Sequence, residues 1–257
     1  MKELRHLFFV TSSPLHQQTS AILLTKIQAL IFDFDGLLVD TETPAFESWR
    51  TLYAEYGHEL TLELWQGALG TSHGFDALAH LAAVTAQPID RPALLARRMA
   101  AKHALSAKQP LLPGAREILG QAAALGLPCA VASSSSRDWV LGWMRHHGIE
   151  AAFACIRTAD DVVRTKPAPE LFLSAAACLT APPASCLVFE DSPNGILAAR
   201  AAGMRCVAVP GAITRRLALP SADLLIDSLD ALPLTDILAS VSSHSSGGLG
   251  AAKPPPR

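Results

Sequence analysis

The sequence is poor in charged residues and has almost no excess of either sign. Only 17% of its 257 residues are charged, and 21 lysines and arginines against 23 acidic residues give a net charge of −2. It contains no long basic run of the kind that binds nucleic acid or an anionic membrane surface. Half of the residues are apolar, which excludes a largely disordered chain. We therefore expect a globular protein whose partner is a small neutral or anionic molecule, with no nucleic acid and no membrane.

Cysteine is also scarce, and no two cysteines form a CxxC pair. The five cysteines lie far apart in the sequence, which argues against zinc ribbons and dithiol redox motifs. Each has apolar neighbours, so we expect buried, unpaired thiols in a reducing compartment. No stretch approaches the roughly 20 apolar residues of a membrane helix, and the apolar run 7–10 is too short for a signal peptide. These absences predict a cytoplasmic protein.

Neither end of the chain has the pattern of a packed domain. Residues 1–25 are mixed in composition and show no clear period, and we expect an appended arm whose role the sequence does not give. Residues 242–257 are rich in serine and glycine and end in three prolines and an arginine. Such a composition buries too little apolar surface to fold, so we expect a disordered tail.

Between these ends, short apolar runs alternate with segments of helical periodicity. This alternation is typical of a parallel sheet covered by helices on both faces. A glycine follows three of the four helical segments, as expected where a helix ends. The predicted fold class is α/β, with a Rossmann-like parallel sheet. The predicted strands are Gln28–Phe34, Pro128–Ala132, Cys186–Phe189, Arg205–Val209 and Leu224–Ile226, and the predicted helices are Ala115–Leu125, Arg137–His147, Ala168–Leu179 and Asn194–Ala202.

The stretch between the first and second predicted strands interrupts the alternation, because it has helical patterns and no buried strand. Thr43 and Pro44 predict the N-cap and the first residue of a helix, and Thr61 and Asp90 predict two further caps. A helical insertion after the first strand would lie over the crevice where open α/β sheets bind ligands. The predicted domains are therefore a core of residues 26–43 and 110–241 and a helical cap of residues 44–109.

Two of the predicted strands end in a pair of acidic residues. Asp33 and Asp35 lie at the end of the first strand, and Glu190 and Asp191 follow the third. The carboxyl ends of parallel strands meet at one edge of a sheet, so the two pairs can converge although they are far apart in the sequence. Clustered carboxylates repel each other unless a cation offsets their charge. We therefore predict a Mg²⁺ site made by these four residues.

Two further signals favour a phosphate ligand. Ser133 and Ser134 begin a run of four serines that leads from the second predicted strand into a helix. Hydroxyl groups and free amides at a helix N-terminus suit a phosphate, although serines at this position are also common helix caps. Lys166 stands directly before a proline that starts a predicted helical segment. Near clustered carboxylates, a lysine can neutralise charge and hold a phosphoryl oxygen.

Taken in order along the chain, these signals resemble the four motifs of the haloacid dehalogenase-like hydrolases. The resemblance covers roughly residues 27–235. The inserted helical stretch is similar to the cap of the subfamily that contains β-phosphoglucomutase and many sugar-phosphate phosphatases. The four motifs are matched by Asp33–Glu42, by Ser133, by Lys166–Pro167 and by Glu190–Gly195.

This resemblance implies a Mg²⁺-dependent phosphatase that hydrolyses a small phosphorylated metabolite through an aspartyl phosphate. Asp33 would be the nucleophile, and Asp35 would protonate the leaving group and then activate water. A carboxylate at position 35 favours ester hydrolysis, since the dehalogenases of the family lack it and the transport ATPases carry threonine there. The remaining implied roles are phosphate binding by Ser133, Ser134 and Lys166 and Mg²⁺ binding by Asp33, Asp35, Glu190 and Asp191, with Asp35 contributing its backbone carbonyl.

The nearest alternative enzyme is a phosphosugar mutase. Mutases of the β-phosphoglucomutase kind use a cap arginine and a histidine shortly after the first motif. Residues 67–74 contain no arginine, and Ala45 stands about where the histidine would be. A receiver-like signalling domain also combines an acidic cluster with a hydroxyl group and a lysine, but the spacing of Asp33 and Asp35 and the helical insertion argue against it.

The identity of the substrate stays open. Trp65, Thr71, Ser72 and His73 lie in the predicted cap and are candidates to contact a leaving group. The alternatives are a core position for Trp65 and a solvent-exposed position for His73. The sequence gives neither the phosphorylated substrate nor the oligomeric state.

Overall fold

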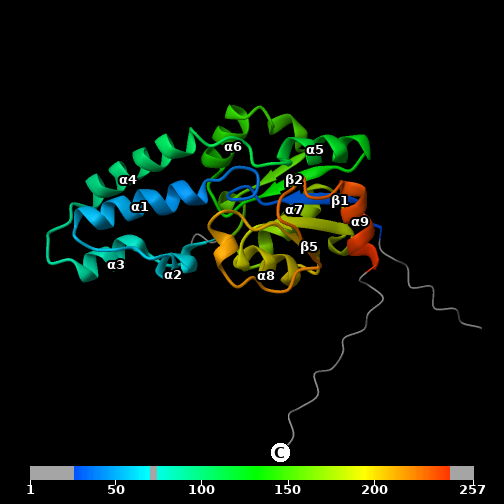
Figure 1. Ribbon diagram of the computed structural model, residues 1–257. Helices are drawn as coiled ribbons and strands as arrows, with labels where there is room; N and C mark the ends of the chain where they lie inside the picture. Colours follow the sequence, from blue (N-terminus) through cyan, green and yellow to red (C-terminus); the bar gives the residue numbers. More distant parts are fainter. Residues whose placement is uncertain (1–25, 70–73, 244–257) are drawn as a thin grey trace, which may run out of the picture.

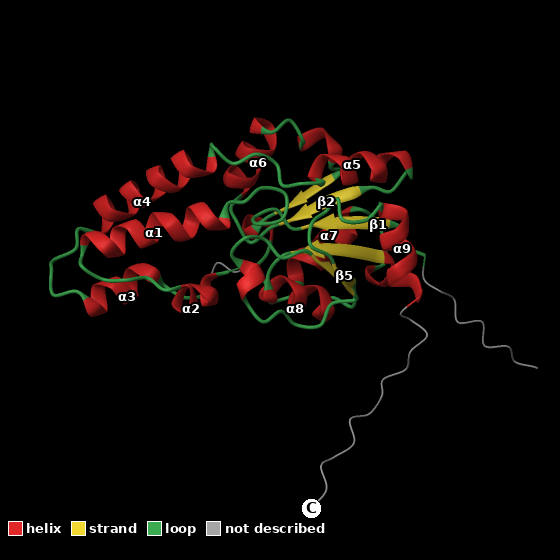
Figure 2. Cartoon of the chain, viewed as in Figure 1, coloured by secondary structure: helices red, strands yellow, loops and turns green. Residues whose placement is uncertain are grey.

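A parallel sheet of six strands forms the centre of the protein (Figure 1 and Figure 2). The computed structural model describes residues 26–69 and 74–243. Neighbouring strands are parallel, in the order β3-β2-β1-β4-β5-β6. The predicted α/β class is confirmed. The strands are β1 (Ala29–Phe32), β2 (Cys129–Ala132), β3 (Cys155–Arg157), β4 (Cys186–Glu190), β5 (Arg205–Ala208) and β6 (Leu224–Leu225).

Helices cover both faces of the sheet, and the residues of each strand alternate between the two faces. The covering helices are α5 (Ala115–Ala124), α6 (Arg137–His146), α7 (Glu170–Cys178), α8 (Pro193–Ala201) and α9 (Leu234–Ser243). On one face, α5, α6 and α9 share a buried cluster with Leu30 and Phe32. On the other face, α7 and α8 share one with Ala29 and Ile31. Because both faces are covered, β1 is apolar throughout, as a central parallel strand requires.

A helical region joins β1 to β2 and extends to one side of the sheet (Figure 1). Its elements are α1 (Glu42–Glu55), α2 (Leu62–Trp65), the 3-10 helix η1 (Gln66–Ala68), α3 (Ala77–Val84) and α4 (Arg91–Ser106). Helix α1 packs against α4. Trp49, Tyr53 and Leu81 belong to a buried hydrophobic cluster that comes mainly from these helices. The helical region therefore has a core of its own beside the core of the sheet.

Two of the three predicted helix caps in the helical region are confirmed. The side chains of Thr61 and Asp90 each accept a hydrogen bond from a backbone amide in the first turn of their helix. The third prediction is wrong, because α1 begins one residue before Thr43. The residue at the N-cap position is Thr41, and its hydroxyl donates to Asp35 instead of capping the helix. The Thr41 hydroxyl therefore bonds to the site residue Asp35 and not to the backbone of α1.

Strand β3 and helix α9 are absent from the predicted elements. Strand β3 has three residues, of which two are partly exposed, so it lacks the apolar run of a buried strand. Helix α9 buries Leu234, Ile237 and Val241 at helical spacing, a signal that the sequence does carry. This helix extends to Ser243 and so overlaps the start of the predicted tail. The rest of that tail and the predicted arm lie outside the described residues.

No helix in residues 26–69 and 74–243 is long and apolar enough to cross a membrane.

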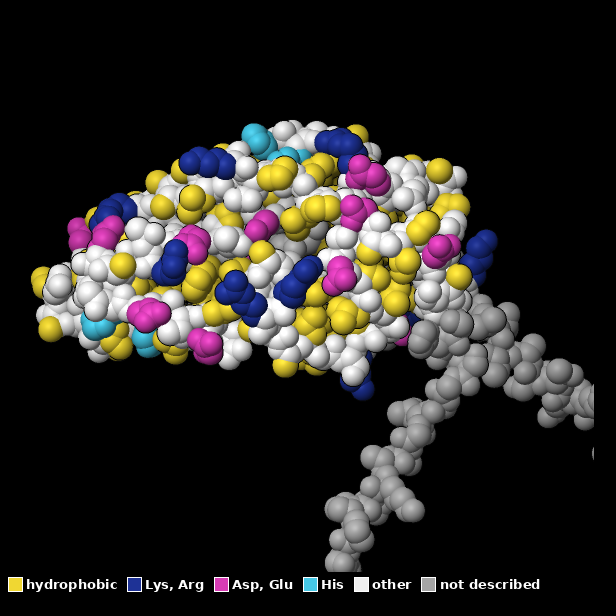
Figure 3. All heavy atoms as spheres, in the orientation of Figure 1, with side chains coloured by type: hydrophobic (Ala, Val, Ile, Leu, Met, Phe, Trp, Pro, Cys, Tyr) yellow, Lys and Arg dark blue, Asp and Glu magenta, His cyan; other side chains and the backbone are white. Residues whose placement is uncertain are grey.

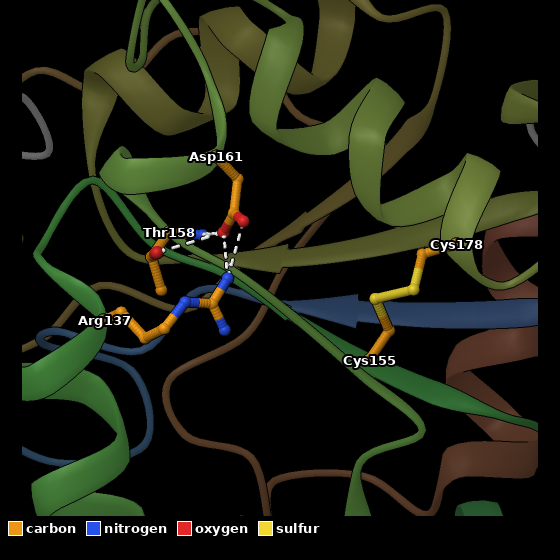
Figure 4. Close-up of a disulfide and its surroundings, with 5 residues drawn as sticks. All are labelled: Arg137, Cys155, Thr158, Asp161 and Cys178. Carbon is orange, nitrogen blue, oxygen red and sulfur yellow. Dashed lines mark hydrogen bonds and ion pairs between the residues drawn. A yellow bond between two sulfur atoms is a disulfide. The ribbon is translucent and has the colours of Figure 1, made fainter.

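The prediction of five unpaired cysteines is wrong for two of them. Cys155 in β3 and Cys178 at the end of α7 form a disulfide (Figure 4). Helix α7 packs on β3 and brings the two residues together, although 23 positions separate them in the sequence. Cys129, Cys186 and Cys206 are buried free thiols, as predicted. The pairing has no sequence motif because it depends on a tertiary contact.

The disulfide predicts how many thiols react in the unfolded protein. In denaturant without reductant, we expect the three free cysteines to react with an aromatic disulfide reagent, and all five to react after reduction. A Cys178→Ser variant should show the three free thiols plus Cys155, which loses its partner. Five reactive thiols in wild-type protein purified without reductant would contradict the disulfide.

Candidate active site

The predicted acidic residues converge at the carboxyl-terminal edge of the sheet, where β1 lies between β2 and β4. Asp33 follows β1, Glu190 is the last residue of β4, and Asp191 comes next. Oxygen atoms of these three carboxylates lie within 4.8 Å of one another, and all three residues are buried. The structure thus brings together the carboxylates of three of the four predicted metal ligands.

Lys166 provides a positive charge inside this acidic cluster. Its side chain is 1% exposed and donates hydrogen bonds to Asp33 and to Glu190 Oε1 (2.5 Å). Burial acts to lower the pKa of Lys166, but the two carboxylates outweigh burial and raise it above its ordinary value. Lys166 is therefore a charged, fixed group, and its predicted approach to the clustered carboxylates is observed.

With all three carboxylates ionised, negative charge would exceed positive charge in the cluster. Burial raises the pKa of Asp33 to about 8; Lys166 opposes this shift, and Glu190 adds to it. Burial and the neighbouring Glu190 also raise the pKa of Asp191 well above its usual range. A divalent cation would relieve this repulsion, and carboxylate oxygens are ligands that Mg²⁺ prefers. The residues present therefore fit a magnesium ion.

The carboxylate of Asp35 is not part of this cluster. Its Oδ1 accepts hydrogen bonds from Thr41 Oγ1 (2.5 Å) and Trp139 Nε1 (2.8 Å). Its Oδ2 accepts from Ser133 Oγ (3.0 Å) and Ser135 Oγ (2.7 Å). Protein donors therefore occupy both oxygens. The metal contact that the family resemblance implies for Asp35 uses its backbone carbonyl and does not compete with these bonds.

Within the run of four serines, one residue caps a helix and others lie beside Asp35 and the cavity. Ser136 is the N-cap of α6 and accepts a hydrogen bond from Trp139 N (3.4 Å). Ser133 is buried and donates to Asp35, and Ser134 lines the neighbouring cavity. Capping therefore falls to the last serine of the run, and the two serines predicted to bind phosphate lie at the site.

A cavity of about 350 Å³ lies beside these groups and is lined from both the sheet edge and the helical region. Asp33 and Asp35 both face it from the sheet edge. Arg98 and Lys102 line it from α4, and sequence reasoning missed them because basic residues on such a helix are typical of a solvated face. Their spacing of four residues, which puts them on one side of the helix, is the signal that could have found them. The lining residues are Asp33, Asp35, Glu42, Ala45, Trp65, Ala68, Arg98, Lys102, Ser134 and Ser135.

Of the cap residues predicted to contact a leaving group, Trp65 lines this cavity. It is also 5% exposed and belongs to the hydrophobic cluster of the helical region, so it is both a core residue and a cavity residue. Its indole N–H has no hydrogen-bond partner within the described part of the chain. Thr71, Ser72 and His73 lie outside the described residues.

A parallel α/β sheet with acidic strand ends and a helical insertion is the arrangement that the resemblance to haloacid dehalogenase-like hydrolases implies, and comparison with known proteins confirms the resemblance. The family model for haloacid dehalogenase-like hydrolases matches residues 30–209. A protein of Bacillus subtilis named "Putative phosphatase YhcW" is 40% identical over 221 residues, which cover 85% of this chain and 100% of YhcW. The chain belongs to the haloacid dehalogenase-like hydrolases, and it is a phosphatase of that family.

Two further relatives indicate the group within the family. Validoxylamine A 7'-phosphate phosphatase of Streptomyces hygroscopicus subsp. limoneus is 31% identical over 205 residues. The match covers 77% of this chain and 92% of that phosphatase. A crystal structure of a CbbY variant from Rhodobacter sphaeroides with xylulose-(1,5)bisphosphate gives a TM-score of 0.66 at 29% identity, covering 79% of this chain and 95% of that one. The predicted group, with β-phosphoglucomutase and phosphatase relatives, is confirmed. Membership in it argues against the receiver-like alternative.

The acidic cluster yields a test of metal binding. We expect Asp191→Asn to weaken Mg²⁺ binding about tenfold or more, because it removes a ligand charge at almost constant volume. Titration calorimetry measures the affinity, and the rise in unfolding temperature on adding Mg²⁺ should shrink in parallel. Asp138→Asn, which changes an exposed acid in the first turn of α6, is the matched control. Equal Mg²⁺ affinities in the two variants would contradict the assignment.

Proposed function

We propose that this phosphatase hydrolyses a small phosphorylated metabolite with Mg²⁺, through an aspartyl phosphate formed on Asp33. The observation that carries the proposal is the shared cavity, which Asp33 and Asp35 both line. Asp33 is also held by the buried Lys166 within the acidic cluster. A nucleophile, an acid–base group and a metal-binding cluster around one cavity are the parts that phosphoryl transfer requires.

The reaction would proceed in two displacements. In the first, an oxygen of Asp33 attacks phosphorus, the bond to the leaving oxygen breaks, and Asp35 donates a proton to that oxygen. In the second, water attacks phosphorus, Asp35 takes a proton from the water, and the bond between phosphorus and Asp33 breaks to release inorganic phosphate. Lys166, Ser133 and Ser134 would hold the phosphoryl oxygens. Bound Mg²⁺ would supply the positive charge that offsets the acidic cluster and the phosphoryl group.

Residues 44–109 would act as a cap on a core of residues 26–43 and 110–241. Several groups of the helical region line the cavity that holds the reacting carboxylates. In addition, Asn194 Nδ2 donates to the backbone carbonyl of Leu69 (2.7 Å), which ties the start of α8 to the helical region. A cover of this kind would exclude water while the leaving group departs.

A small-molecule partner also suits the protein surface. On the face drawn in Figure 3, basic and acidic side chains are interspersed among apolar ones. Nucleic-acid binding requires a concentrated basic surface instead. The cytoplasm remains our predicted location, and the disulfide between Cys155 and Cys178 would be unusual there, because such bonds persist mainly in oxidising compartments.

The substrate would carry a second anionic group on its leaving part. Arg98 and Lys102 both face the cavity, and neither forms an ion pair within residues 26–69 and 74–243. Burial lowers the pKa of each, and the carboxylate of Glu42 in the same cavity opposes this shift only in part, so their charges are incompletely solvated. The indole N–H of Trp65, which has no partner among residues 26–69 and 74–243, adds a hydrogen-bond donor beside them. Xylulose-(1,5)bisphosphate, which is bound in the crystal structure of the CbbY variant, has this doubly anionic character.

This substrate class predicts a selective effect of Arg98→Met. We expect kcat/KM for a sugar bisphosphate to fall about tenfold or more, because a charge-assisted hydrogen bond is lost. The fall should be much smaller for an aryl phosphate that carries no second charge. Arg97→Met is the matched control, since Arg97 pairs with Glu55 on the exposed side of α4. Equal losses on both substrates would remove the support for a second anionic group.

A phosphosugar mutase is the second candidate, and Arg98 is the observation that favours it. The arginine that residues 67–74 lack is supplied to the cavity from α4. Ala45, however, lines the same cavity at about the position of the mutase histidine, and it offers no acid or base. The phosphatase is therefore better supported.

The covalent mechanism is tested by Asp33→Asn. We expect this variant to lose turnover of an aryl phosphate by about a thousandfold or more, because the amide is a poor nucleophile. Acid-quenched wild-type protein should carry one phosphate by mass spectrometry, and the variant should carry none. Released inorganic phosphate as the main product separates hydrolysis from a mutase, which would return an isomeric sugar phosphate. Turnover near the wild-type level in Asp33→Asn would rule out the aspartyl phosphate.

A further inference from the structure

Trp139 contacts the proposed acid–base residue, although no motif in the sequence marks it. It lies in the first turn of α6 and is 8% exposed. Its indole N–H donates to Asp35 Oδ1 (2.8 Å). Trp143, one turn further along α6, is buried as well, but its indole N–H has no partner within the described residues. Buried indole N–H groups usually find a partner, and the partner of Trp139 is the carboxylate that the proposed reaction uses.

The indole differs from the other donors to Asp35 in its freedom to adapt. Thr41, Ser133 and Ser135 donate through hydroxyl groups, which rotate and can accept as well as donate. The indole N–H lies in the plane of a rigid ring and can only donate. Among these four donors, the indole of Trp139 is therefore the one that cannot turn to follow the Asp35 carboxylate.

The ring of Trp139 is held in turn by helix α4. Lys102 Nζ lies 3.8 Å from the ring centroid, and the ring of His103 packs against it at 5.0 Å between centroids. Trp143 packs edge-on against the ring, at 5.5 Å between centroids. Lys102 and His103 belong to the helical region. Trp139 therefore contacts that region through its ring and Asp35 through its indole N–H.

We propose that Trp139 is a positioning residue of the phosphatase. Its indole N–H sets the orientation of the Asp35 carboxylate, and its contacts with Lys102 and His103 make that orientation depend on the place of α4. This inference rests on the proposed function, in which Asp35 moves the proton. Trp139 itself acts through Asp35 and not on the substrate.

The Trp139→Phe variant tests this role because it keeps an aromatic ring in the packing and removes the N–H donor. We expect kcat for an alkyl phosphate to fall about tenfold with little change in KM, since a hydrogen bond to a charged group is lost. The fall should be smaller for an aryl phosphate, whose good leaving group needs less proton donation. Trp143→Phe is the matched control, because it keeps an aromatic ring against Trp139 and removes an indole N–H that has no partner among the described residues; both rates should fall far less than in Trp139→Phe. Equal losses on both substrates, or equal losses in both variants, would overturn the proposal.

A double-mutant cycle separates action through Asp35 from a general loss of structure. In an Asp35→Ala background, Trp139→Phe should cause no further loss of the residual activity. Independent, multiplying losses would overturn the proposal. If wild-type protein shows no hydrolysis, or Asp33→Asn keeps it, the proposed function fails. If both of those results hold and Trp139→Phe matches wild type, only the role of Trp139 fails.

A measurement on the indole N–H does not require the Trp139→Phe variant to fold. The chain has four tryptophans, so ¹⁵N-labelled protein gives four indole N–H signals, and single Phe variants at Trp49, Trp65 and Trp143 leave the Trp139 signal assigned by elimination. Asp35→Ala should shift the Trp139 signal most, because it removes that group's acceptor. An unchanged Trp139 signal in this variant would overturn the proposal.

Discussion

The burial of three carboxylates around one lysine is the constraint on which the rest of the structure depends. Ionised groups leave water at a cost of several kcal/mol each unless opposite charge and hydrogen bonds replace the lost hydration. Lys166 replaces part of it, and two glycines leave the room that the carboxylates need. A Cβ on Gly195 would lie 1.8 Å from the Glu190 carboxylate, and one on Gly36, where φ is +87°, would lie 2.4 Å from Asp191 Oδ2. A larger residue at either position would displace a group of the acidic cluster.

The strand order explains how these groups meet. Strand β1 pairs with both β2 and β4, and Phe32 lies level with Val131 and with Phe189. The following residues, Asp33 after β1, Glu190 in β4 and Ser133 one position further along, after β2, therefore reach the same edge, where apolar sequence gives way to polar sequence. The chain also leaves β1 at this edge and continues into the helical region. Residues directly after β1 and residues of the helical region therefore line the same cavity. The buried charges and the cavity thus lie together because the chain leaves β1 at the edge of the sheet where the acidic residues meet.

Much of this arrangement could be predicted from the sequence because it depends on local patterns. The short apolar runs before Asp33 and Glu190 predict the central strands, and the acidic residues that end these runs predict the acidic cluster. Arg98 and Trp139 could not be found in this way. Arg98 reads as an ordinary solvated helix residue, and Trp139 fits the apolar side of an amphipathic helix. Their part in the site depends on the packing of α4 and α6 near the sheet edge, as the Cys155–Cys178 disulfide depends on the packing of α7 against β3.

The two reacting carboxylates of the proposed mechanism are held in physically different ways. Asp33 is fixed by a buried ammonium group, and such a charged contact is strong and costly to break. Asp35 is held by neutral donors from Thr41, Ser133, Ser135 and Trp139, which are worth far less individually. A nucleophile must stay in line with phosphorus through both displacements, whereas an acid–base group has to serve a leaving oxygen first and a water molecule afterwards. The three hydroxyl donors rotate and so permit that adjustment about the direction that Trp139 sets, whereas a single buried ion pair would oppose it.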